Sequence, residues 1–288
     1  MKKKILEASI ACLFVLFSFY YTEKAIHIVE QKDPIMKQIL KEKEKKEETS
    51  VDAVLNDQFL LPGYNGYMVD VEASFSKMKR YGSYNENLYV FEEVEPTISI
   101  EDYYDKYISS GNGLTNTIAF IFVIKEGMEV DEIKTVLDQN NVRGTFFVDG
   151  VWLEQKKDEV YQLVDDFHEV EILSYDGGYD PLLFTGVLDQ LQLLTNQKGK
   201  YCYAEYDQKE ILELCEKEKM HTIIPTLRVE KNFYQTVKGK VGAGYIIEVE
   251  NTKENRKELG VVINYLKQRG YLLDTLDHLL SEARDFEK

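Results

Sequence analysis

Apolar residues follow two alternating periods in the second half of the chain. Short continuous apolar runs predict buried strands, and they lie at 118–122, 145–148, 170–173 and 222–224. Apolar residues three or four positions apart predict amphipathic helices between them, around 130–137, 160–167, 182–194, 211–215 and 259–266. This alternation predicts an α/β fold with a parallel sheet or barrel. In such folds the functional groups lie at the carboxyl ends of the strands.

A smaller α+β module is expected at 59–112. Apolar residues from Val71 to Met78 fall on one face of a predicted helix, and Gly82 stands where its C-cap would be. A strand is predicted at 88–91. A segment of about 50 residues makes only a marginal core by itself, so we expect this module to pack against the larger C-terminal domain.

The N-terminus predicts a membrane anchor. Three lysines, Lys2 to Lys4, precede 17 residues, Ile5 to Tyr21, that are apolar, aromatic or small except for Glu7. The lysines would stay in the cytoplasm, so the remainder of the chain would face outward. A cleaved signal peptide is the alternative, but it needs small residues at its exit and 19–24 offers none.

Between the anchor and the module, charges of both signs alternate closely. This composition predicts a solvated helix or a flexible stalk, and we interpret it as a spacer. Asp33-Pro34 is a signal for a helix start. The expected organisation is a cytoplasmic tip with the anchor at 1–29, a charged stalk at 30–58, the small module at 59–112 and the larger domain at 113–288.

Charge and cysteine content limit the possible partners. The formal net charge of −16 excludes nucleic acid, whose phosphates would be repelled. The acidity suits solubility, a cationic partner or a divalent cation. Cys12 lies in the expected anchor, and Cys202 and Cys215 are 13 positions apart, the second on an apolar helix stripe. We expect these two to be buried free thiols rather than a disulfide. No Cys/His spacing indicates zinc.

The larger domain resembles a known enzyme family. Residues 117–127, Thr-Ile-Ala-Phe-Ile-Phe-Val-Ile-Lys-Glu-Gly, are followed by a predicted helix and then by Asn-Val-Arg-Gly-Thr-Phe-Phe-Val-Asp-Gly at 141–150. This order resembles the opening of the polysaccharide deacetylases (NodB-homology, carbohydrate esterase family 4). The resemblance extends to about Leu280. It implies an irregular, partly open (β/α) barrel.

The positions that carry the chemistry of that family are replaced here. The two aspartates that end its first strand correspond to Val123 and Ile124. Ser174 holds the register of the His-Ser-x-x-x-His motif. Four further family positions are affected: the two metal-ligand histidines, the motif arginine and the general-acid histidine. They fall on Leu173, on Gly177 or Gly178, on Tyr203 and on Glu250.

The replacements predict a site without metal or catalysis. A hydrolytic metal needs roughly three protein ligands and an open position for water. Ile124, Leu173 and Gly177 supply no lone pairs, and Val123 cannot accept a proton. We therefore expect no cofactor, and we expect Ile124 and Leu173 to be buried and turned into the barrel.

Aromatic and acidic residues remain at the predicted strand ends. Rings that stack on sugars and carboxylates that accept hydroxyl protons are typical of a sugar-binding groove. The groove candidates are Tyr175, Asp176, Tyr203, Glu205, Tyr206, Glu248 and Glu250. Glu248 and Glu250 are two positions apart on one strand, so they point to the same face.

Three functions are consistent with these features. The first is an inactive, membrane-anchored, extracytoplasmic deacetylase homologue that binds or scaffolds cell-envelope glycan. The second is an active deacetylase with a rebuilt site, in which Asp176, Glu205 and Glu250 hold a divalent metal. The third is a protein-interaction module of an envelope assembly complex. The expected partners are the membrane, through the N-terminal helix, and an envelope glycan or protein.

Overall fold

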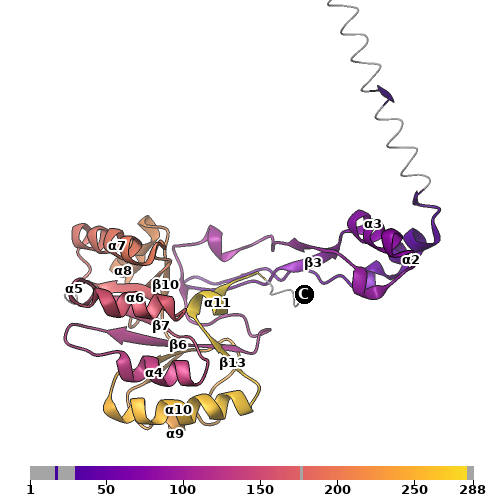
Figure 1. Ribbon diagram of the computed structural model, residues 1–288. Helices are drawn as coiled ribbons and strands as arrows, with labels where there is room; N and C mark the ends of the chain where they lie inside the picture. The colour runs from indigo at the N-terminus through magenta and orange to yellow at the C-terminus, as the bar shows by residue number, and fades with distance from the viewer. Residues whose placement is uncertain (1–16, 19–29, 176–177, 284–288) are drawn as a thin grey trace, which may run out of the picture. The chain divides into compact units, whose positions relative to one another are not determined.

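The computed structural model describes residues 17–18, 30–175 and 178–283. They divide into two compact units, which are coloured along the chain in Figure 1. The smaller unit combines residues up to 50 with 66–94, and the larger combines 51–65 with 95 onward. The division therefore differs from the expected boundaries, because each unit is built from two separate stretches of the chain.

The smaller unit packs two helices and a two-stranded sheet around one apolar cluster. Its elements are α2 (Pro34–Glu42), η1 (Lys43–Lys45), β3 (Gly66–Val69), α3 (Val71–Tyr81), η2 (Glu86–Leu88) and β4 (Phe91–Val94), with β3 and β4 antiparallel. Met36 and Ile39 of α2 are buried with Phe75 and Met78 of α3. The expected spacer is therefore wrong over α2, because this helix has an apolar face that belongs to a core.

Local signals in the smaller unit act largely as the sequence indicated. The Asp33 carboxylate accepts the Ile35 amide at 2.9 Å, and Pro34 opens the helix. Gly82 ends α3 in the left-handed conformation at φ 95°, where a side chain would be strained. The strand expected at 88–91 instead begins at Phe91, because the preceding residues form the short η2 turn.

The larger unit is built on an 11-stranded sheet. Its strands are β1 (Val54–Leu55), β2 (Phe59–Leu61), β5 (Tyr107–Ile108), β6 (Thr117–Ile124), β7 (Thr145–Asp149), β8 (Glu169–Ser174), β9 (Tyr201–Tyr203), β10 (His221–Ile223), β11 (Leu227–Val229), β12 (Ile246–Val249) and β13 (Leu272–Asp274). Their order is β1-β2-β5-β10-β9-β8-β7-β6-β12-β11, with β13 beside β6. Only the β1–β2 pair is antiparallel among these pairings. The sheet curls but does not close, as expected for a partly open barrel.

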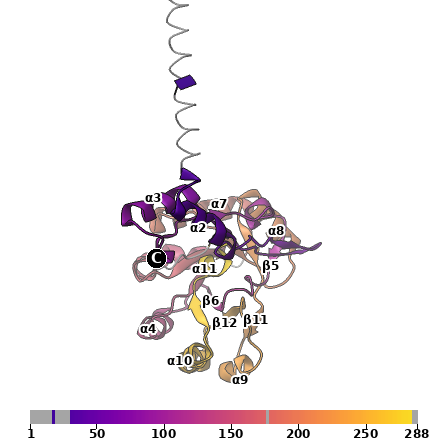
Figure 2. The same cartoon turned by 90° about the vertical axis from the view of Figure 1, so that its right-hand side faces the viewer.

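Helices cover the outer face of this sheet. They are α4 (Asp131–Gln139), α5 (Gly150–Gln155), α6 (Lys157–Asp165), α7 (Pro181–Thr195), α8 (Lys209–Lys217), α9 (Phe233–Val237), α10 (Lys253–Gln268) and α11 (Leu276–Leu280). Figure 2 shows α4, α10 and α9 side by side along β6, β12 and β11. α11 is different, because its leucines pack into the inner cluster of the sheet.

Both faces of β6 are apolar because both are covered. Phe120 and Phe122 face the helices, and Ala119 and Ile121 face the inner cluster. This burial explains why the strand reads as a continuous apolar run rather than as an alternating one. The inner cluster, which includes Leu173 and Phe147, fills the barrel below the site.

Cys202 of β9 and Cys215 of α8 form a disulfide, with their Cα atoms 6.3 Å apart. The expectation of free thiols is therefore wrong. Both residues are fully buried, and α8 packs back on the strand that precedes it, so the two side chains face each other. The sequence spacing alone does not reveal this approach.

No helix within the described ranges is long and apolar enough to cross a membrane. The expected anchor, 5–21, lies outside those ranges except for Phe17 and Ser18.

Candidate functional site

The carboxyl ends of the parallel strands gather most of the residues that the sequence singled out. Val123, at the end of β6, is half-buried and packs on the inner cluster that contains Leu173. Leu173 itself is 5% exposed. The expectation that Leu173 is buried inside the barrel is confirmed. An apolar pair therefore stands at the family's base and metal-ligand positions.

Ile124 is fully buried but not inside the barrel. It belongs to the helix-facing cluster, with Phe122 and Phe146. The expectation that Ile124 and Leu173 face the same interior is therefore wrong. Successive strand residues point to opposite faces, so Ile124 and its neighbour Val123 cannot both face inward on a regular strand.

An arginine that sequence reasoning missed organises the opposite side of the site. Arg228 of β11 pairs in register with Glu248 of β12, so both side chains emerge on one face. The guanidinium Nε donates to Glu248 Oε2 at 2.6 Å. Nη2 donates to the Tyr203 hydroxyl at 3.0 Å and to the Glu205 carbonyl at 2.8 Å. The local signal was weak, because a single arginine in a short strand is common.

Tyr203 completes this arrangement, which we call the Arg228 cluster: Tyr203, Glu205, Arg228 and Glu248. Its hydroxyl donates to Glu248 Oε2 at 2.9 Å. Burial, with Glu248 beside it, raises the pKa of the Tyr203 hydroxyl above its ordinary value, so it stays protonated and remains a donor. Tyr203 and Glu248 are each 8% exposed. Their polar atoms are thus engaged with protein groups.

Asp149 is a second residue that sequence reasoning missed. It ends β7, is buried, and caps α5 by accepting the Val151 amide at 2.9 Å. Ser174 donates to its other oxygen at 3.4 Å. A β-bulge at this position places Asp149 opposite Ser174. A capping aspartate before a helix was a readable signal, and it assigns the carboxylate to the backbone.

The remaining groove candidates make no hydrogen bond to the Arg228 cluster among the described residues. Tyr175 is half-buried and packs so closely on α5 that a Cβ at Gly150 would lie 2.4 Å from its ring. Tyr206 and Glu250 are exposed beyond their strands. Asp176 and Gly177 lie outside the described residues. The structure therefore brings together Tyr203, Glu205 and Glu248, and leaves Tyr206 and Glu250 at the periphery.

The described residues at this edge do not fit the family's metal. No group of three His, Cys, Asp or Glu side chains that could hold an ion occurs in the described part of the chain. The Glu248 carboxylate is already paired with a guanidinium, and Glu205 lies 3.2 Å from the same cation. A fixed positive charge at this distance opposes the binding of a second cation.

The chain was compared with protein families and with curated proteins. No family model matches the chain. An uncharacterized protein of Bacillus subtilis (strain 168), YlxY, is 25% identical over 281 residues, covering 90% of this chain and 87% of that protein.

Solved structures of carbohydrate esterase family 4 proteins are similar to this chain. A carbohydrate esterase family 4 pseudoenzyme from Bacillus anthracis, BA3943, superposes with a TM-score of 0.68 at 24% identity, covering 88% of this chain and 97% of that one. A BA3943 mutant described as having restored enzymatic activity gives a TM-score of 0.69 at 25% identity, covering 88% and 100%. The family 4 carbohydrate esterase PdaA of Bacillus subtilis gives 0.55 at 19% identity, covering 62% and 85%. The resemblance expected from the sequence is therefore confirmed.

Proposed function

Since the chain is a degenerate homologue of the polysaccharide deacetylases (carbohydrate esterase family 4), we propose that it is a catalytically inactive protein of the cell envelope that binds or scaffolds glycan. The observation that carries this proposal is which side chains occupy the old site, meaning the place where active members of the family hold their metal. Val123 and Leu173 fill one side of it, and the Arg228 cluster occupies the other. Among the described residues, neither side offers a carboxylate free of the guanidinium or a group of ligands that could hold a metal.

The Arg228 cluster supports the absence of a metal cofactor in chemical terms. In an active metal hydrolase a cation polarises the scissile carbonyl and activates water. Here the guanidinium supplies positive charge but has no exchangeable ligand position, because its nitrogens already donate to Glu248, Tyr203 and Glu205. Similarity to a pseudoenzyme of the same fold agrees with this interpretation.

Two independent features support the proposal of an extracytoplasmic location. The Cys202–Cys215 disulfide is typical of proteins that fold in an oxidising compartment. The lysines before the apolar segment 5–21 orient it with the C-terminal units outward. Carbonate extraction of cells tests the anchor, and the full-length protein should stay in the membrane pellet. Recovery in the supernatant, or an N-terminus near Ala25, would contradict a membrane anchor.

The periphery of the site is the proposed glycan contact. Tyr206 is 58% exposed, so its ring is available for stacking, and the Glu205 carboxylate beside it is exposed. Retention on insoluble envelope polysaccharide should fall for Tyr206→Ala. Tyr161→Ala is the matched control, because Tyr161 is a similarly exposed tyrosine on α6. Equal retention of both variants would count against this contact.

One observation favours protein interaction as a second candidate function. Helix α7 carries Leu182 and Leu193 on its outer side, exposed by 86% and 84%. Contiguous exposed apolar patches mark surfaces that meet another protein, and Leu183, 49% exposed, adds to the apolar surface beside Leu182. Cross-linking in cells, compared between the wild-type chain and Leu182→Ser with Leu193→Ser, tests this candidate, which predicts the loss of a specific cross-link in the variant.

A further inference from the structure

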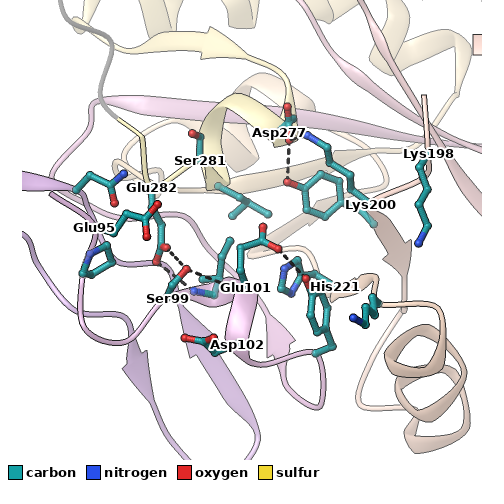
Figure 3. A pocket seen from close by; sticks show the side chains of 18 of the residues that line it. Glu95, Ser99, Glu101, Asp102, Lys198, Lys200, His221, Asp277, Ser281 and Glu282 are labelled. Atoms are coloured by element: carbon teal, nitrogen blue, oxygen red, sulfur yellow. Dashed lines mark hydrogen bonds and ion pairs between the residues drawn. The ribbon is translucent and has the colours of Figure 1, made fainter. Parts of the chain in front are cut away.

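The larger unit contains a cavity at the end of the barrel opposite to the old site. Its volume is about 920 Å³, which is ample for a small ligand. Lys200, Tyr201 and His221 stand at the amino ends of β9 and β10, whereas the deacetylase positions stand at carboxyl ends. Figure 3 shows the side chains that line it. The proposed glycan site makes no use of this cavity.

His221 is an unusual residue in the wall of this cavity. It is 3% exposed, and neither ring nitrogen has a hydrogen-bond partner within the described residues. Burial lowers the pKa of His221 to about 4, so the ring is neutral at pH 7, with one N–H donor and one acceptor nitrogen. A buried polar atom left without a partner destabilises the fold, because it has lost its hydrogen bonds to water. The ring is therefore suited to a group that both donates and accepts.

A partly exposed tyrosine covers the histidine. The Tyr104 ring stacks on the His221 ring with centroids 4.5 Å apart, and its hydroxyl donates to Glu101 at 2.6 Å. The nitrogens of His221 are themselves buried. A ligand would therefore have to displace the Tyr104 ring to reach the nitrogens of His221.

Lys200 and Asp277 form an ion pair in the lining of the cavity, and other charges there have no ion-pair partner among the described residues. One wall, from residues 95–102, carries the carboxylates of Glu95 and Asp102, and neither has an ion-pair partner in the described part of the chain. The other wall carries Lys198, whose ammonium donates only to the Glu218 carbonyl, and Lys219, which has no acidic partner among the residues described. Figure 3 shows Asp102 and Lys198 on different sides of His221.

We propose that this cavity binds a short zwitterionic peptide, with its ammonium against the Glu95–Asp102 wall and its carboxylate against the Lys198–Lys219 wall. A peptide amide offers one donor and one acceptor, which is what the neutral His221 ring lacks. A neutral glycan fits less well, because it would leave both walls unpaired.

Alanyl-alanine tests the proposal directly, in titrations of the full-length chain in detergent. Binding is followed by calorimetry and by the imidazole NMR signals of His221. The free dipeptide should bind and shift those signals. Blocking one end, as in N-acetyl-alanyl-alanine or alanyl-alanine amide, should weaken binding at least tenfold, because each cap removes one charge that a wall recognises.

Variants assign the two walls. Asp102→Asn should weaken binding of the free dipeptide and leave the affinity for N-acetyl-alanyl-alanine unchanged. Lys219→Gln should also weaken binding of the free dipeptide and leave the affinity for alanyl-alanine amide unchanged. Lys217→Gln, an exposed lysine on α8 outside the cavity, is the matched control and should change neither. Unshifted His221 signals at millimolar dipeptide would overturn the proposal, as would equal binding of the capped forms. Because Lys219 and Asp102 are exposed, these variants should fold normally.

Discussion

Arg228 and Glu248 are register partners on adjacent parallel strands, and their side chains meet at 2.6 Å at the edge where the deacetylase family carries out its chemistry. The carboxylate is buried and the arginine is about one-third exposed. The pair thus neutralises an inward-facing acid without a metal. It also holds Tyr203 in a position where it cannot contact a ligand freely.

Arg228→Leu should lower the free energy of unfolding by about 2–3 kcal/mol, because Glu248 would keep a charge in a buried place without a cation. The double variant Arg228→Leu with Glu248→Leu should recover most of that loss. Urea unfolding measures both. The exposed pair Lys209–Glu213 is the control, and Lys209→Gln should change stability by less than about 0.5 kcal/mol. A loss as small as the control's would show that the pair has no structural role.

Leu173→His should lower stability by roughly 1–3 kcal/mol, because the imidazole loses apolar contacts in the inner cluster and gains no metal. Leu193→His, on the exposed side of α7, is the control and should be nearly neutral. Thermal unfolding with and without zinc is the measurement. If Leu173→His formed a tight zinc site at no cost in Tm, the pocket around Leu173 would have to be open.

Removing the Cys202–Cys215 disulfide, as the double alanine variant, should destabilise the larger unit by about 3 kcal/mol, the value typical of a loop of this length. Thiol titration of the unfolded wild-type chain without reductant should detect one cysteine, Cys12. Three reactive thiols would contradict the disulfide and would remove one argument for an oxidising compartment.

Two carboxyl groups in the amino-terminal half of β8, the half-buried Glu169 and the buried Glu171, predict a pH dependence. Glu169 accepts from Thr145, Leu276 and Asp277, and Glu171 accepts from the amides of Lys200 and Tyr201. Burial raises the pKa of Glu169 to about 7 and that of Glu171 well above its ordinary value.

A raised carboxyl pKa means that the folded state holds the proton more tightly than the unfolded state does. The stabilisation that Glu169 contributes is complete below pH 4.5, the ordinary pKa of its carboxyl group. It is lost as the pH rises through about 7, the pKa of the same group in the folded state. Glu169→Gln should therefore flatten the fall in unfolding free energy across this window, by roughly 3 kcal/mol from the size of the shift. Chemical unfolding at a series of pH values is the measurement, with exposed Glu213→Gln as the control. Parallel wild-type and Glu169→Gln curves would contradict the assignment.

The sequence was informative where local patterns decide the outcome. The apolar run ending at Ile124, the cap at Asp33 and the helix stop at Gly82 were each readable from neighbouring residues. The side occupied by Ile124 was also readable, because strand residues alternate. Arg228 was not, because its role depends on a strand pairing that no local signal specifies. No local signal specifies the approach of Cys202 and Cys215 either, or the building of each unit from two separate stretches of the chain.

The central claim is that the old deacetylase site is chemically inactive. It is tested most directly by incubating the purified protein with zinc, cobalt or nickel and acetylated chitooligosaccharides or peptidoglycan, and measuring released acetate together with bound metal. The account predicts no acetate above the metal-only background and no stoichiometric metal. Acetate release that Glu250→Ala abolishes would contradict it, and would show a rebuilt active site.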